Sequence, residues 1–211
     1  MSFKKNKYKV LKQAISPELA KFVYSYFLNK RNTARFLFDQ KYLSPFNTEY
    51  GVWNDEQVPN TYSHYSDMAM ETLLQTLNPK MESETGLKLY PTYSYARIYK
   101  KGDILARHKD RYSCEVSTTL NLGGESWPIY LDPTGKTGQA GIKVELKPGD
   151  MLIYSGCELE HWREPFEGKD CAQVFLHYNN AKAKSAKENK FDKRPMLGLP
   201  SYYKGFTVPK K

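Results

Sequence analysis

The segment ARIYKKGDILARHKD (residues 96–110) and the later segment CELEHWREP (157–165) indicate how this chain of 211 residues folds and what it binds. His108 and Asp110 are two positions apart, so on an extended strand their side chains point to the same face. His161 follows 51 residues after Asp110 (161 − 110). Two imidazoles and one carboxylate on one face of a metal ion, with other positions open, are the ligand set of non-haem Fe(II) sites that use O2. The sequence therefore predicts a metal site at His108, Asp110 and His161 and favours an oxygenase.

Turn residues place both segments near the ends of strands. Residues 95–99 alternate as in a strand, a Lys-Gly-Asp turn follows at 101–103, and residues 104–108 return to extended chain. Proline before glycine in LKPGD (146–150) ends one strand and lets the strand that leads to His161 begin. The candidate ligands are thus expected at neighbouring strand ends.

Helical patterns come first in the chain and strand patterns follow. A first helix is predicted to begin at Ser16-Pro17, because serine can cap a helix and proline favours its first position. A second helix is predicted from Asp67 to about Leu77, with Asn78-Pro79 just past its end. Residues 42–62 read as loops around a short strand. From about residue 87 to about 178, short alternating segments are separated by turn residues. We therefore predict an α+β fold: a double-stranded β-helix, or jelly-roll, core with N-terminal helices packed on its sheet.

Composition fits one soluble domain. At 24.5 kDa with 40% hydrophobic residues, the chain can bury one sizeable core. We expect a helical part over about 1–86, the jelly-roll core over about 87–180 and a basic tail over about 181–211. No apolar run is long enough to span a bilayer, and the start lacks the apolar segment of a signal peptide. The three cysteines lack metal-ligand spacing, which favours free thiols in the cytoplasm.

The tail carries most of the net charge of +9. It contains nine basic residues and two acidic ones, Glu188 and Asp192, so its net charge is +7. These basic residues are Lys182, Lys184, Lys187, Lys190, Lys193, Arg194, Lys204, Lys210 and Lys211. Attraction to a polyanion or an acidic protein is one interpretation; a solvated tail is the one we favour, because no aromatic residue interleaves with the lysines before Phe191.

Three runs together carry a family resemblance. YARIYKKGDILARHKDRYSCEVSTTLNLGG, KPGDMLIYSGCELEHW and CAQVFLHY resemble the catalytic core of the 2-oxoglutarate and Fe(II)-dependent dioxygenases, in particular the prolyl 4-hydroxylase-like branch. The resemblance covers roughly residues 95–178 and implies that His108, Asp110 and His161 ligate iron. It also implies that Tyr99 reaches 2-oxoglutarate. The carboxylate at position 110 favours a hydroxylase over a halogenase.

One position departs from the family. An Arg or Lys usually lies about nine to eleven residues after the distal histidine and holds the distal carboxylate of 2-oxoglutarate; here that window contains Asp170 and an adjacent Cys-Ala pair. Three other residues are candidates: Arg163, Lys169 and Gln173. Arg163 shares the face of His161 if the strand stays extended, whereas Lys169 follows a glycine in an expected turn.

The resemblance implies hydroxylation of a C–H bond, with a prolyl residue of a protein or peptide as the first candidate and with release of succinate and CO2. Fe(II) and 2-oxoglutarate are the implied cofactor and cosubstrate, and ascorbate is a further candidate. A protein or peptide is the expected partner; the basic tail leaves nucleic acid open, and no membrane partner is expected. The alternative is a non-catalytic, cupin-like jelly-roll module that binds a metal or ligand. His64 is interpreted as a surface or packing residue and His177 as a structural residue of an apolar strand.

Overall fold

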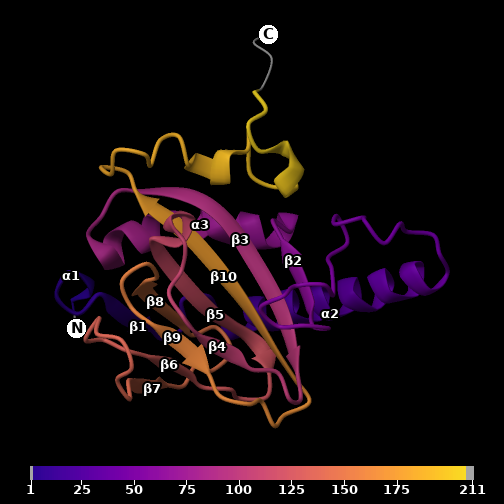
Figure 1. The fold of residues 1–211 in the computed structure, drawn as a ribbon, viewed down its shortest axis with the longest axis horizontal. Coiled ribbons are helices and arrows are strands. Elements are labelled where there is room, and N and C mark those ends of the chain that lie inside the picture. The colour runs from indigo at the N-terminus through magenta and orange to yellow at the C-terminus, as the bar shows by residue number, and fades with distance from the viewer. Residues whose placement is uncertain (1, 208–211) are drawn as a thin grey trace.

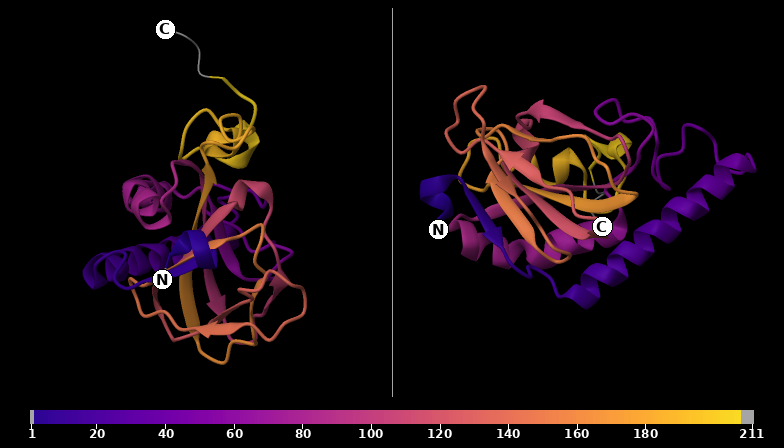
Figure 2. Two further views of the ribbon diagram at one scale, coloured as in Figure 1. Left: turned by 90° about the vertical axis from the view of Figure 1, so that its left-hand side faces the viewer. Right: turned by 90° about the horizontal axis from the view of Figure 1, so that it is seen from below.

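The computed structural model describes residues 2–207 and consists of two stacked antiparallel sheets with helices on one side (Figures 1 and 2). The larger sheet has six strands in the order β1 (Tyr8–Leu11), β8 (Met151–Ser155), β5 (Val116–Gly124), β10 (Asp170–Asn180), β3 (Leu89–Lys100) and β2 (Tyr62–Tyr65). The smaller sheet has four in the order β4 (Leu105–His108), β9 (His161–Arg163), β6 (Ile129–Leu131) and β7 (Ile142–Val144). This architecture confirms the predicted α+β jelly roll. β1 and β2 extend the sheet from the part of the chain that was expected to be helical.

Two long helices cover the outer face of the larger sheet (Figure 2). The other helical segments are short: α1 (Phe3–Asn6) and the 3-10 turns η1 (Tyr112–Cys114), η2 (Lys190–Lys193) and η3 (Ser201–Tyr203). α2 (Pro17–Asp39) begins where predicted, and the Ser16 hydroxyl accepts a hydrogen bond from the amide of Leu19 at 3.2 Å. None of the helices in the described part has the length and apolar character that crossing a bilayer requires.

α3 (Met68–Thr85) is longer than predicted. Its N-terminus is capped by Asp67, whose carboxylate accepts from two backbone amides of the first turn. The helix does not end before Asn78-Pro79 but continues through Pro79 for another turn and a half. Proline removes one backbone hydrogen bond, whereas burial of Met81 against the sheet favours continuation. Tertiary packing therefore overrides the local signal.

Apolar side chains form two layers. One lies between the helices and the larger sheet, where Phe27, Leu74 and Val174 are fully buried. The other lies between the two sheets and contains Tyr99 and Trp127 at one end of the sandwich. This second layer is rich in aromatic residues, whose large, stiff side chains line the space between the sheets.

Residues 181–207 are only in part the solvated tail that we favoured: their lysines are exposed, but the segment is attached to the rest of the fold by buried polar residues. Arg194 is 3% exposed, and its guanidinium binds the carboxylate of Glu71 on α3 (Nη2–Oε1 2.7 Å, Nη1–Oε2 3.2 Å). Asp192 is also buried and accepts from Arg111 and from Tyr65. These ion pairs join segments more than 80 residues apart in sequence, so no local pattern reveals them.

Replacing Arg194 with alanine is expected to lower the free energy of unfolding by about 3–5 kcal/mol, because Glu71 loses its cation while it stays buried. Chemical denaturation measures this loss. The double variant Glu71→Met/Arg194→Met removes both charges and is expected to recover much of it. Equal stability of Arg194→Ala and the wild type would show that this segment does not contribute to the fold.

Candidate metal centre

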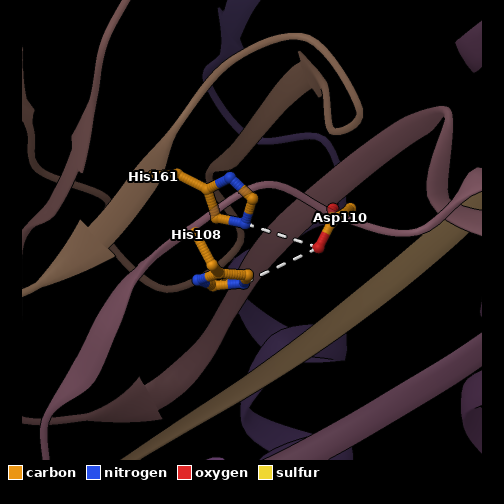
Figure 3. Close-up of side chains that lie close together, drawn as sticks. All are labelled: His108, Asp110 and His161. Atoms are coloured by element: carbon orange, nitrogen blue, oxygen red, sulfur yellow. Dashed lines mark ion pairs between the residues drawn. The ribbon is translucent and has the colours of Figure 1, made fainter. Parts of the chain in front are cut away.

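The structure brings the three predicted ligands together (Figure 3). His108 ends β4, Asp110 follows it, and His161 begins β9, which pairs with β4 so that the two histidines are opposite each other. Asp110 Oδ1 lies 3.5 Å from His161 Nε2 and 3.7 Å from His108 Nε2. One donor atom from each residue lies within 4.8 Å of the other two. The pairing of β4 with β9 thus brings Asp110 close to His161, although 51 residues separate them in sequence.

The far nitrogen of each imidazole is held by a backbone carbonyl. Nδ1 of His108 lies 2.7 Å from the carbonyl oxygen of Ala106, and Nδ1 of His161 lies 3.1 Å from that of Leu159. A carbonyl only accepts, so Nδ1 carries a proton in both rings, and Nε2 is the nitrogen that faces Asp110. Such backbone contacts fix the tautomer and the orientation of metal-binding histidines.

The surroundings of Asp110 and His108 shift their pKa values in directions that favour binding of a cation. Burial alone raises the pKa of Asp110, but the hydrogen bond and charge of His161 outweigh it and lower this pKa to about 2. Burial lowers the pKa of His108, and the neighbouring His161 lowers it further. At neutral pH the carboxylate is therefore ionised and His108 is neutral, which are the protonation states that metal binding needs.

The three residues line a cavity of about 330 Å³ between the sheets. Its walls combine aromatic side chains with charged groups, among them Tyr93, Tyr95, Tyr99, Arg97, Tyr154 and Phe175. Asp55 and Gln57 reach it from the loop that follows α2 and returns from beyond the edge of the sheet (Figure 1). Gln57 Nε2 lies 3.2 Å from His108 Nε2, and Asp55 pairs with Arg97 at 2.6 Å.

Sequence reasoning missed this loop contribution. Residues 42–62 were predicted as loops around a short strand without a functional role, and the loop's contact with His108 is long-range. Arg97 could have been found, because it is two residues from Tyr99 on β3 and both line the cavity.

The four residues that were predicted to bind 2-oxoglutarate differ in burial and in their distance from the cavity. Tyr99 is fully buried and lines the cavity. Arg163 lies on β9 on the same face as His161, while the intervening Trp162 stacks on Tyr130 of the neighbouring strand. Gln173 is buried and accepts from the hydroxyl of Thr119 at 3.0 Å. Lys169 lies exposed at the turn before β10. Of the four residues only Tyr99 lines the cavity; Arg163, Gln173 and Lys169 are not among its lining residues.

Arg163 is a buried cation whose hydrogen-bond partners are neutral. Its guanidinium donates to the Trp127 carbonyl and to the Thr119 hydroxyl, and its Nε has no partner among residues 2–207. Burial lowers the pKa of Arg163, while the nearby phenols of Tyr99 and Tyr154 act in the opposite direction. A guanidinium stays charged even so. Since an isolated buried charge is costly, the site favours an anion beside Arg163.

The donor set fits a divalent metal of the iron type. Two imidazole nitrogens and one carboxylate oxygen form a facial triad, and this set suits non-haem Fe(II). Asp110, Cys114 and His177 form a second cluster of potential ligands. Burial and the charge of Asp110 raise the pKa of the Cys114 thiol, so it is protonated at neutral pH and is a poor ligand. The cluster of His108, Asp110 and His161 is therefore the better metal site.

No protein-family model matches this sequence, and no curated protein matches it. Solved structures do match. AviO1 from Streptomyces viridochromogenes Tue57 is 15% identical with a TM-score of 0.62, over 87% of this chain and 94% of that one. EctD from S. alaskensis with bound Fe is 16% identical with a TM-score of 0.58, over 84% and 74%.

The viral collagen prolyl hydroxylase of Paramecium Bursaria Chlorella virus-1, in its 2-oxoglutarate complex, is 10% identical with a TM-score of 0.54, over 82% of this chain and 95% of that one. The two sheets, the helices on the larger one and the His-Asp-His cluster between them agree with this likeness. The chain therefore has the fold of the 2-oxoglutarate and Fe(II)-dependent oxygenases, as its sequence motifs predict.

Proposed function

We propose that the protein is an Fe(II)- and 2-oxoglutarate-dependent dioxygenase that hydroxylates a C–H bond. The observation that carries this proposal is the convergence of His108, Asp110 and His161 on one cavity with their donor atoms directed at one another. When bound there, Fe(II) supplies O2 chemistry coupled to oxidative decarboxylation of 2-oxoglutarate, which yields succinate, CO2 and a hydroxylated product.

The chain's own groups hold and orient the reactants. The three ligands bind the metal and leave its remaining positions open. Tyr99, which lines the cavity, and Arg163, which is buried near Tyr99 and Tyr154 behind the cavity wall, are proposed to bind 2-oxoglutarate; the guanidinium can meet the distal carboxylate with two parallel hydrogen bonds. Tyrosine and phenylalanine side chains line the cavity in which the reaction would take place.

A prolyl residue of a protein or peptide is the substrate that we propose to test first. The structural neighbours include the viral collagen prolyl hydroxylase and a prolyl-4-hydroxylase from Pseudomonas putida, which is 14% identical with a TM-score of 0.53 over 84% of this chain and 95% of that one. Proline-containing peptides are therefore the first additions to the assay below.

The test is 2-oxoglutarate turnover in air. Protein loaded with Fe(II) is expected to form succinate and CO2 in equal amounts from 2-oxoglutarate, even slowly without a substrate, and omission of Fe(II) is expected to stop this turnover. Succinate is measured by chromatography, with Lys136→Ala as a control variant because that side chain is exposed and is not among the residues that line the cavity. Metal binding without any succinate, across a peptide panel, would favour the non-catalytic jelly-roll module instead.

A further inference from the structure

The two oxygens of the Asp110 carboxylate have different surroundings. Oδ1 faces Nε2 of both His108 and His161 at 3.7 and 3.5 Å. Oδ2 instead accepts a hydrogen bond from the hydroxyl of Ser117 on β5 at 2.7 Å. Ser117 is fully buried on a central strand of the larger sheet. The serine thus holds one oxygen away from the histidines and leaves the other directed at them.

The hydrogen bonds around Ser117 run in one direction. Its Oγ lies 2.7 Å from Asp110 Oδ2, 2.8 Å from the Cys114 carbonyl and 3.0 Å from Nδ1 of His177. The carboxylate and the carbonyl only accept, so the single hydroxyl proton is donated to them. Oγ must then accept from His177, which assigns the proton of this ring to Nδ1. The resulting chain is His177 Nδ1–H to Ser117 Oγ–H to Asp110 Oδ2.

His177 and Gly156 fix the two ends of this chain. The His177 ring is buried and packs on the ring of Tyr93 with centroids 4.6 Å apart. The Gly156 carbonyl accepts from the amide of Asp110 at 2.9 Å, and a side chain at position 156 would collide with Asp110 Oδ2 and with the Cys114 carbonyl. The carboxylate therefore has little freedom to rotate.

We propose that Ser117 and His177 are positioning residues that present Asp110 to the metal through Oδ1. This inference rests on the proposed iron site and adds the two side chains that shape it. With Oδ2 engaged by Ser117, Asp110 would offer one oxygen to the metal rather than two, and a chelating cosubstrate would then have room beside it. Contacts of this kind tune metal affinity about 10- to 100-fold.

The test compares Co(II) binding by the purified full chain and its variants, followed by visible absorption in the absence of 2-oxoglutarate. Ser117→Ala removes the donor to Oδ2, and His177→Phe removes the donor to Ser117 while it keeps an aromatic ring on Tyr93. Both are expected to weaken Co(II) binding about 10- to 100-fold. His177→Asn, whose amide can donate in place of Nδ1, is expected to restore part of the affinity.

Ser94→Ala is the matched control, because Ser94 is a buried serine whose hydroxyl has no hydrogen-bond partner among residues 2–207. It is expected to bind Co(II) like the wild type. Wild-type affinity in both Ser117→Ala and His177→Phe, whatever their thermal stability, would overturn the positioning role. Equal weakening by His177→Asn and His177→Phe would also overturn the proposed chain. If the wild type itself fails to bind Co(II), the proposed iron site is contradicted, which is a separate result.

Discussion

Alanine at position 108, 110 or 161 is expected to weaken Fe(II) binding by more than about 100-fold and to abolish 2-oxoglutarate turnover. Each of His108, Asp110 and His161 provides one donor atom, and the three donors lie within 4.8 Å of one another. After any one of these replacements, only two protein ligands remain to hold the ion. Anaerobic titration with Fe(II) measures the affinity, and succinate formation measures turnover.

The fold is expected to survive these changes, because the three side chains lie at the cavity and outside the main apolar core. Circular dichroism and thermal unfolding check this point. His64→Asn serves as a control: His64 is also a buried histidine, but it binds Asp67 at 3.2 Å outside the cavity. Full turnover by any one of the three alanine variants would remove that residue from the ligand set.

The second large effect is expected at Arg163. Arg163→Ala should raise the apparent KM for 2-oxoglutarate about 30-fold or more, because truncation of a buried charge partner costs about 2–5 kcal/mol. Fe(II) affinity should change by far less, since Arg163 is not a ligand. Arg163→Lys should restore only part of the affinity, because an ammonium cannot make two parallel hydrogen bonds with a carboxylate.

A sharper variant is Arg163→Met, since it removes the charge but retains much of the volume. Without 2-oxoglutarate it is expected to be at least as stable as the wild type, because Arg163 is buried with neutral partners. Addition of 2-oxoglutarate and Fe(II) should raise the Tm of the wild type and leave that of Arg163→Met nearly unchanged.

Unchanged 2-oxoglutarate affinity in Arg163→Ala, together with weaker binding in Gln173→Ala or Lys169→Ala, would place the anchor on β10 or in the turn before it. Weaker binding in Arg97→Ala alone would assign the anchor to Arg97, a buried arginine that lines the cavity and already has Asp55 as its partner.

The sequence was most informative where function depends on short spacings. Alternation along a strand put His108 beside Asp110 and Arg163 on the face of His161, and turn residues marked the strand ends. These relations depend on backbone geometry over a few residues, which the local pattern records. The start of α2 at Pro17 followed from capping chemistry for the same reason.

Long-range packing was not predictable in this way. α3 continues through Pro79 because the sheet buries its last turns, and the segment after residue 180 folds back because Arg194 meets Glu71, 123 residues away in sequence. The cavity residues Asp55 and Gln57 likewise come from a loop without periodic pattern. In each case the partner is supplied by the fold and not by neighbouring residues.

The central claim is tested most directly by the visible absorption spectrum of the Fe(II)-loaded protein without oxygen, before and after addition of 2-oxoglutarate. An Fe(II) site that chelates 2-oxoglutarate is expected to develop a metal-to-ligand charge-transfer band, and Arg163→Met should need far more 2-oxoglutarate to reach the same intensity. A protein that binds Fe(II) tightly and whose spectrum stays unchanged at saturating 2-oxoglutarate would contradict the assignment as a 2-oxoglutarate-dependent dioxygenase.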